Sequence, residues 1–173
     1  MASTLKINNL DTATGTTITI PTGKQLVGTD SNSIKAPDMI VQVKHHTHAT
    51  TVTSASNGTW VASGTTLAFT PKYANSDLYI YVKIGAEAYG ASNQGVGYRI
   101  QKDGSTVYDN DYALYHSSSN DQRIDQVPII HYEAAGNTNA RTYTLDVRVR
   151  GVGTTRHNIY ANPTTMVIHE VAR

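Results

Sequence analysis

The chain has 173 residues, with 14 Lys and Arg against 13 Asp and Glu, so its formal net charge is +1. This near-neutral balance, without a run of basic residues, excludes the electrostatic surface that nucleic-acid binding needs. No apolar stretch approaches the length of a transmembrane helix. We expect no secretory signal, because the opening MASTLKINNL lacks an apolar segment. The absence of cysteine excludes disulfides and thiolate zinc sites.

The composition predicts an all-β protein. Thr, Val and Ile make up 51 of the 173 residues, while Leu contributes only 7. β-branched side chains are stiff at χ1 and pack well on a pleated sheet. Only 16% of the residues are charged, whereas Thr, Ser and Asn supply 48. A surface rich in hydroxyl and amide groups, without a signal or disulfides, favours a protein made in a bacterial cytoplasm and later exposed on a virus particle.

Residues 1–36 differ from the rest of the chain. They hold isolated apolar side chains and two short alternating stretches in a background of Thr, Asn, Asp and Gly. Such pieces are too short and too polar to fold alone. We therefore expect an extended arm that docks on other chains of the particle, the alternative being an arm folded back on its own domain. The side chains expected to carry this attachment are Leu5, Ile7, Leu10, Ile18 and Ile20.

Residues 38–173 alternate between strand and turn patterns and show no helical period. Two turn pairs, Asn57-Gly58 and Asp103-Gly104, are typical of hairpins. About eight strands in one domain predict an antiparallel two-sheet sandwich, with the jelly roll as the favoured form. The expected strands cover residues 39–43, 59–62, 66–70, 78–84, 98–101, 106–108, 127–132, 141–149 and 165–171.

The strand at 78–84 presents aromatic residues on the face that alternation directs away from the core. These outward residues are Tyr79, Tyr81 and Lys83. Tyrosine combines a large contact area with a polar tip, which suits a subunit interface. We expect these three residues to form a trimer interface, with a sugar-binding surface and a plain solvent face as alternatives. At the strand 141–149, Arg148 and Arg150 could meet Asp146 or acidic groups of a neighbouring chain, with a simply solvated charged face as the commoner case.

The sequence His45-His46-Thr47-His48 is the one histidine cluster. On a strand His46 and His48 would point the same way, and three copies around an axis could then present six imidazoles to a metal ion. The cluster follows the first strand of the body and is expected to enter a loop, where surface histidines are the ordinary case. We therefore expect no metal.

The sequence offers little for catalysis. It contains no Gly-x-Ser-x-Gly elbow, no His-Glu-x-x-His and no phosphate-binding glycine loop. Asp109, Asp111 and Asp121, with His116 nearby, could supply a glycosidase-like carboxylate pair. Carboxylates in a polar stretch more often form turns. We expect no catalytic residues, no cofactor and no enzymatic activity.

Six segments of the chain look familiar together: residues 3–7, 17–24, 26–30, 37–43, 67–76 and 165–171. They resemble structural proteins of tailed bacteriophages, above all the tail-fibre and fibre-like proteins of aquatic phages. The resemblance covers most of the chain, but its motifs are structural and serve no chemistry. It implies an N-terminal attachment arm and a C-terminal jelly roll like that of tumour necrosis factor, assembled as a homotrimer. The histidine cluster is not part of it.

The combined expectation is a non-enzymatic virion protein, a trimeric fibre or spike that docks on the tail or capsid and contributes to host recognition. Loops 85–97 and 109–126 are expected to contact a host glycan through Tyr89, Tyr112 and Tyr115, because a trimer turns weak contacts into avidity. A capsid decoration protein is the first alternative, favoured by a short chain without a repetitive shaft. A free carbohydrate-binding module is the second, although the chain has no visible signal and a single Trp.

Overall fold

The structure is a computed structural model, and the chain divides into two units, Met1–Ile34 and Lys35–Arg173. The expected attachment residues Leu5, Ile7, Leu10, Ile18 and Ile20 lie outside the residues that it describes. The described residues are 22–23, 36–55, 57–89, 93–117, 122–151, 153–159 and 162–173.

The described part of the second unit is built of ten β-strands and contains no helix. Within the described ranges there is accordingly no helix long and apolar enough to cross a membrane. The strands are β1 Ile40–His48, β2 Val52–Ser54, β3 Val61–Phe69, β4 Asp77–Tyr89, β5 Gln94–Lys102, β6 Ser105–His116, β7 Gln122–Ala134, β8 Arg141–Arg150, β9 Thr154–His157 and β10 Thr164–Val171.

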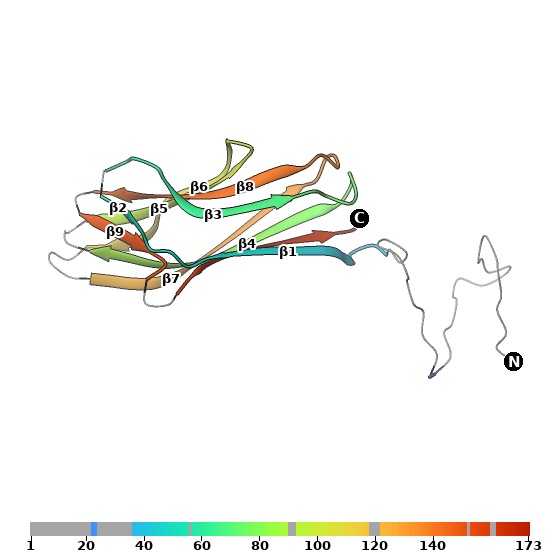
Figure 1. The fold of residues 1–173 in the computed structure, drawn as a ribbon, viewed down its shortest axis with the longest axis horizontal. Coiled ribbons are helices and arrows are strands. Elements are labelled where there is room, and N and C mark those ends of the chain that lie inside the picture. The colour runs from blue at the N-terminus through green and yellow to red at the C-terminus, as the bar shows by residue number, and fades with distance from the viewer. Residues whose placement is uncertain are drawn as a thin grey trace, which may run out of the picture. The chain divides into compact units, whose positions relative to one another are not determined.

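The strands form two antiparallel sheets that pack face to face (Figure 1). In sheet A the order is β1-β10-β4-β7, and β9 and β2 continue the sheet beside the second half of β4. In sheet B the order is β3-β8-β5-β6. If β2 and β9 are set aside and the other eight strands are numbered along the chain, the sheets read 1-8-3-6 and 2-7-4-5. This is the strand order of a jelly roll, so the predicted all-β antiparallel sandwich is confirmed.

The core lies between the sheets and follows the predicted alternation. On β4, Leu78, Ile80, Val82 and Ile84 are buried, while the residues between them face outward. On β8 the buried residues are Tyr143, Leu145, Val147 and Val149. Period-two burial on facing strands is what two sheets with one shared apolar layer require.

The Asp103-Gly104 hairpin is confirmed, and its two residues have φ of +50° and +83° between β5 and β6. The Asn57-Gly58 hairpin is wrong. The chain there crosses from β2 in sheet A to β3 in sheet B, and Asn57 forms an isolated bridge with Val149. The expected strands 59–62 and 66–70 merge into β3, because a bulge between its residues 62 and 66 absorbs the break in the alternation.

The two long loops expected at 85–97 and 109–126 are also wrong. β4 continues to Tyr89 and β5 begins at Gln94, while β6 continues to His116 and β7 begins at Gln122. Polar strand ends at the sheet periphery lack the apolar alternation that marks a strand in sequence. The residues expected to contact a host therefore lie in strands: Tyr89 ends β4, and Tyr112 and Tyr115 belong to the second half of β6.

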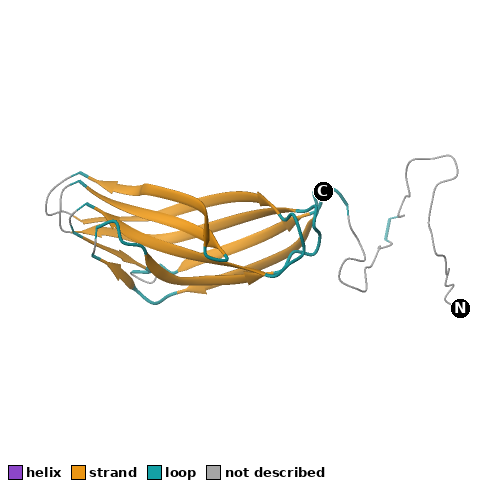
Figure 2. Ribbon diagram, turned by 90° about the horizontal axis from the view of Figure 1, so that it is seen from above, coloured by secondary structure: helices purple, strands orange, loops and turns teal. Residues whose placement is uncertain are grey.

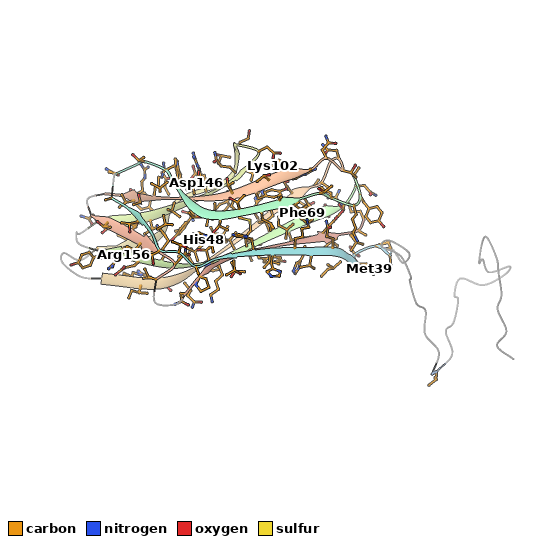
Figure 3. All side chains as sticks on the ribbon, in the orientation of Figure 1. Met39, His48, Phe69, Lys102, Asp146 and Arg156 are labelled. Carbon is orange, nitrogen blue, oxygen red and sulfur yellow. The ribbon has the colours of Figure 1, made fainter. Side chains whose placement is uncertain are left out.

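The sandwich has two distinct ends, which we call the base and the tip. At the base the chain enters β1 and leaves β10, and the Asp38 amide donates to the Ala172 carbonyl at 2.8 Å. The Ala172 amide donates in turn to the Met39 carbonyl at 2.9 Å. Figure 2 shows the strands running lengthwise from this end, where the C-terminus lies. At the tip lie the end of β4 and Arg156 of β9, opposite Met39 (Figure 3).

Candidate functional site

The outer face of sheet A carries the residues that the sequence assigns to a trimer interface. Tyr79, Tyr81 and Lys83 project from β4 on the side away from the core, as the alternation predicts. β4 lies between β10 and β7, so these side chains occupy the middle of the sheet. The geometry thus places them together on one exposed surface.

The cross-strand partners of Tyr81 on this face are apolar, and its ring also lies 5.3 Å from the ring of His169. Across β7 its partner is Ile130, which is 65% exposed, and across β10 its partner is Val167. Beside them lies a groove of about 380 Å³ lined mainly by apolar residues. A large exposed isoleucine next to tyrosines is typical of a surface that another protein covers. We define the sheet A patch as Val43, Tyr79, Tyr81, Ile130, Tyr132 and Val167.

The base end of the patch is held in place by side-chain contacts. The rings of Tyr79 and Tyr132 lie 5.3 Å apart, and the Tyr132 hydroxyl donates to Asp77 at 2.9 Å. The Arg173 guanidinium donates to the same carboxylate at 2.8 Å. This hydrogen bond from Arg173 lowers the pKa of Asp77. Ordered tyrosines lose less conformational freedom when a partner binds.

The three tyrosines expected to contact a host lie toward the tip, but they do not form one cluster. Tyr112 and Tyr115 both belong to β6, and their ring centroids are 6.0 Å apart. Tyr89 ends β4 in the other sheet, where the Arg156 guanidinium lies 5.9 Å from its ring. All three side chains are exposed.

The backbone of β5 gives Tyr112 its position. A Cβ at Gly95 would collide with the Tyr112 ring, so glycine at this position lets that ring lie across the strand. The Tyr115 hydroxyl donates to the Asn93 side chain at 2.7 Å, which ties it to the start of β5. The two tyrosines of β6 are therefore fixed in place at the tip.

The outer face of sheet B holds an arginine cluster around Trp60 that the sequence does not predict. The guanidinium of Arg148 lies 4.0 Å from the centre of the Trp60 ring, and that of Arg99 lies 4.7 Å away. Arg99 also pairs with Asp146 at 2.7 Å. Cations over an indole ring are attracted by its negative face. Trp60 precedes β3 by one residue, and no local pattern connects it to the arginines.

The expected pairing of Arg148 with Asp146 is wrong. Arg148 and Arg150 both pair with Asp111 of β6, the latter at 2.5 Å. Asp146 stands in register with Arg99 on β5, and so it is already engaged. Partial burial lowers the pKa of Arg148. Because each arginine of this cluster has a carboxylate partner, the face does not form an open anion site.

A buried histidine lies near the tip. His157 of β9 is fully buried, and its Nδ1 lies 3.1 Å from the Tyr98 hydroxyl. Its Nε2 lies 3.3 Å from the Thr155 hydroxyl. Burial lowers the pKa of His157 to about 3 and raises the pKa of Tyr98. The two side chains are therefore neutral at physiological pH and serve as hydrogen-bonding members of the core.

The histidine cluster lies in a strand, so its expected position in a loop is wrong. β1 runs through His48, because the chain stays paired with β10 as far as Thr164. His46 and His48 do share a face, as expected of a strand, and both are partly buried at the edge of the sandwich. Among the described residues, no group of three or more His, Asp or Glu side chains could hold a metal ion.

Of the carboxylates considered for catalysis, the structure describes the side chains of Asp109 and Asp111. Asp109 and Asp111 lie in β6, and Asp111 is held by two arginines. The side chains of Asp121 and His116 lie outside the described residues.

Glu170 organises the turn between β3 and β4 at the base. Its carboxylate is fully buried and accepts hydrogen bonds from the Lys72 and Tyr73 amides, each at 2.9 Å. It also accepts from the Ser76 hydroxyl at 2.7 Å and from the Gln42 amide at 3.1 Å. One side chain thus joins β10, β1 and the turn, and sequence reasoning missed it because its partners are distant in the chain.

Replacing Glu170 with alanine is expected to lower the free energy of unfolding by about 3 kcal/mol, because buried donors lose their charged acceptor. The E170Q variant keeps one acceptor oxygen and is expected to lose less than E170A. Urea unfolding at neutral pH measures both. A loss below about 1 kcal/mol for E170A would contradict this role.

Comparison with known proteins yields likenesses of fold. No protein-family model and no curated protein sequence matches the chain. Among solved structures, the chain resembles the protein of infectious bursal virus derived T=1 particles, with 14% identity and a TM-score of 0.46 over 86% of this chain and 41% of that one. The VP2 subviral particle of infectious bursal disease virus gives the same identity and TM-score over 86% and 42%.

A further likeness is to dimeric latent PorU from Porphyromonas gingivalis, with 13% identity and a TM-score of 0.38 over 75% of this chain and 12% of that one. The chain spans about two fifths of the length of the viral proteins it matches. At these identities and TM-scores the likenesses carry no argument about function. The fold assignment rests on the two sheets and their strand order.

Proposed function

We propose that the chain is a non-enzymatic structural protein of a virus particle, a homotrimeric fibre or spike of a tailed bacteriophage. Residues 1–36 attach it to the particle, and the sandwich contributes to recognition of the host surface. The observation that supports this proposal is that the two ends of the sandwich differ. The chain enters at the base beside Ala172, whereas Tyr89, Tyr112 and Tyr115 are exposed toward the tip. Attachment at one end leaves the other end free to meet a host.

The sheet A patch supports the trimer. Its exposed side chains are aromatic or β-branched, and Lys83 lies beside Tyr81 on the same face of β4. Interfaces between copies of one chain are more apolar than ordinary surface. Three copies held together would also raise the avidity of weak contacts at the tip.

A capsid decoration protein is the second candidate, and the same patch favours it, because an apolar sheet face can also lie on a capsid lattice. Particles that lack the protein separate the two functions. Lost adsorption with intact heads supports the fibre or spike. Normal adsorption with heads that break at lower temperature supports the decoration protein.

Alanine variants of Tyr89, Tyr112 and Tyr115 test the recognition role directly. If the tip contacts the host, particles carrying the triple variant are expected to adsorb at least about tenfold more slowly, since exposed aromatic anchors supply much of the energy at such surfaces. Thr106→Ala, on the base end of β6, is the matched control and is expected to adsorb normally. The amount of protein per particle is measured in parallel. Unchanged adsorption by the triple variant at normal occupancy would contradict host recognition.

A further inference from the structure

A groove of about 440 Å³ opens between β6 and β7, along the edge where the two sheets part. Its size lies within the roughly 300–1,000 Å³ typical of small-ligand sites. Strand β6 is the edge of sheet B, and β7 pairs only with β4 in sheet A. The side chains that define it are Tyr108, Asn110, Leu114, Tyr115, Arg123 and Asp125.

The lining of the groove carries no net charge. Its two charged side chains, Arg123 and Asp125, pair with each other at 3.3 Å. Arg123 also donates to the Tyr115 carbonyl at 2.9 Å, which ties β7 to β6 across the groove. A phosphorylated or carboxylated ligand would find no unpaired cation here, so the chemistry favours a neutral ligand.

Hydrogen-bonding groups remain available in the groove. Within the described residues, the Tyr108 hydroxyl has no hydrogen-bond partner, and the Asn110 amide nitrogen donates to no acceptor. The Asn110 side-chain oxygen accepts from the Tyr112 amide at 3.1 Å, which orients the side chain. Tyr115 also lines the groove, and its side chain is exposed. These are the donors and ring faces that hydroxyl-bearing ligands use.

The floor of the groove is apolar, with Leu114 and Val127 buried beneath it and Pro128 at its side. An apolar floor under a polar rim suits a sugar, which presents C–H groups on one face and hydroxyl groups around its edge. An added peptide strand is a poorer fit. Pro128 has no amide hydrogen, so it interrupts the row of donors that β7 could offer along its free edge.

We infer that this groove binds a neutral oligosaccharide of the host surface. Tyr108 and Asn110 form hydrogen bonds with sugar hydroxyls, and the exposed Tyr115 side chain lies against a sugar ring. The inference rests on the proposed recognition function, because it names the ligand class. It also assigns a different kind of partner to each surface. The groove binds a polar, uncharged ligand, and the sheet A patch binds another protein chain.

The test is binding of the purified full chain to an array of immobilised bacterial oligosaccharides, both neutral and acidic. Signal is expected on neutral members. For the strongest of these, Tyr108→Phe and Asn110→Ala are each expected to weaken binding about tenfold, because each removes one ligand hydrogen bond. Thr106→Ala, on the same strand outside the groove, is expected to bind normally. Tyr108→Phe keeps the ring and its packing, so it stays informative if Asn110→Ala unfolds.

Three results would overturn the inference: no signal on any neutral oligosaccharide, signal on acidic members alone, or binding that neither groove variant weakens. Capture of a peptide in the groove with no sugar binding would have the same meaning. The recognition function is judged separately by adsorption. If the Tyr89, Tyr112 and Tyr115 variant adsorbs slowly but the wild-type protein binds no sugar, the recognition function stands and the groove inference fails. If the wild-type protein binds sugar but particles that lack it adsorb normally, the groove inference stands and the recognition function fails.

Discussion

Acidification below pH 6.5 is expected to destabilise the folded protein steeply, mainly through one buried imidazole. His157 has an ordinary pKa of 6.5 when the chain is unfolded, and burial lowers it to about 3 in the fold. Between these values the unfolded chain binds a proton that the folded chain does not. Stability contributed by neutral His157 is therefore complete above pH 6.5 and falls by about 1.4 kcal/mol per pH unit as the pH drops toward 3.

The surroundings of His157 explain why the fold does not accept the proton. Its two ring nitrogens face the hydroxyls of Tyr98 and Thr155, and the Tyr98 ring packs edge-on at 5.5 Å. No described carboxylate pairs with it. A buried imidazolium without an anionic partner would carry a large desolvation cost.

Urea unfolding at several pH values between 7.5 and 4.5 measures this slope. The H157Q variant keeps a polar side chain without a titrating ring, and it is expected to lose most of the slope. A smaller slope remains in H157Q, because burial also lowers the pKa of His131. H45Q, on the exposed side of β1, is the matched control and is expected to follow the wild type. A wild-type slope in H157Q would show that other groups cause the acid lability.

The parts of the fold that depend on local pattern could be predicted from the sequence. The alternation on β4 and β8 identifies their buried faces, and Asp103-Gly104 identifies the hairpin between β5 and β6. These features need only a period of two residues or a turn that requires positive φ. The outward position of Tyr79 and Tyr81 follows from the same alternation.

The parts that depend on pairing between distant segments could not be predicted. Strands β2 and β9 are short and polar, and they exist because Val52–Ser54 pairs with Thr155–His157. The extension of β1 through His48 depends on its pairing with β10. Such pairing leaves no periodic mark in a polar stretch.

The same limit applies to the candidate sites. Tyr115 could be selected from the sequence as an exposed aromatic, but the groove beside it needs β6 and β7 brought together from different sheets. The carboxylate of Glu170 accepts hydrogen bonds from a turn almost a hundred residues earlier in the chain. The one sequence signal for the role of Glu170 is a polar residue at a core-facing position of an alternating strand. A polar group buried there must find hydrogen-bond partners.

The two outer faces of the sandwich differ in how many of their side chains already have partners within the chain. On sheet B the arginines around Trp60 already have partners within the chain, so this face has little left to offer another protein. On sheet A the exposed side chains of the patch are mostly apolar or aromatic. Burying such area releases roughly 25 cal/mol per Å², which makes this face the one that gains most from being covered.

Ile130→Asp is therefore expected to convert a trimer into a monomer. Light scattering on the wild type should give three times the 18.7 kDa mass of one chain, and the variant should give one. Ile130 is 65% exposed and stands beside Tyr81 near the middle of sheet A. A carboxylate buried there without a partner would cost several kcal/mol at each copy of the interface, enough to dissociate it at micromolar concentrations.

Ile124→Asp is the matched control for this prediction. Ile124 lies on the same strand and is 47% exposed, but it lies six residues nearer the tip, beyond the sheet A patch. The control is expected to remain a trimer, which separates loss of the interface from a general effect of an added charge. Dissociation of both variants would show that the interface covers the whole length of β7. A wild-type protein that is monomeric at high concentration would contradict the trimer, and the exposed patch would then favour the capsid decoration protein.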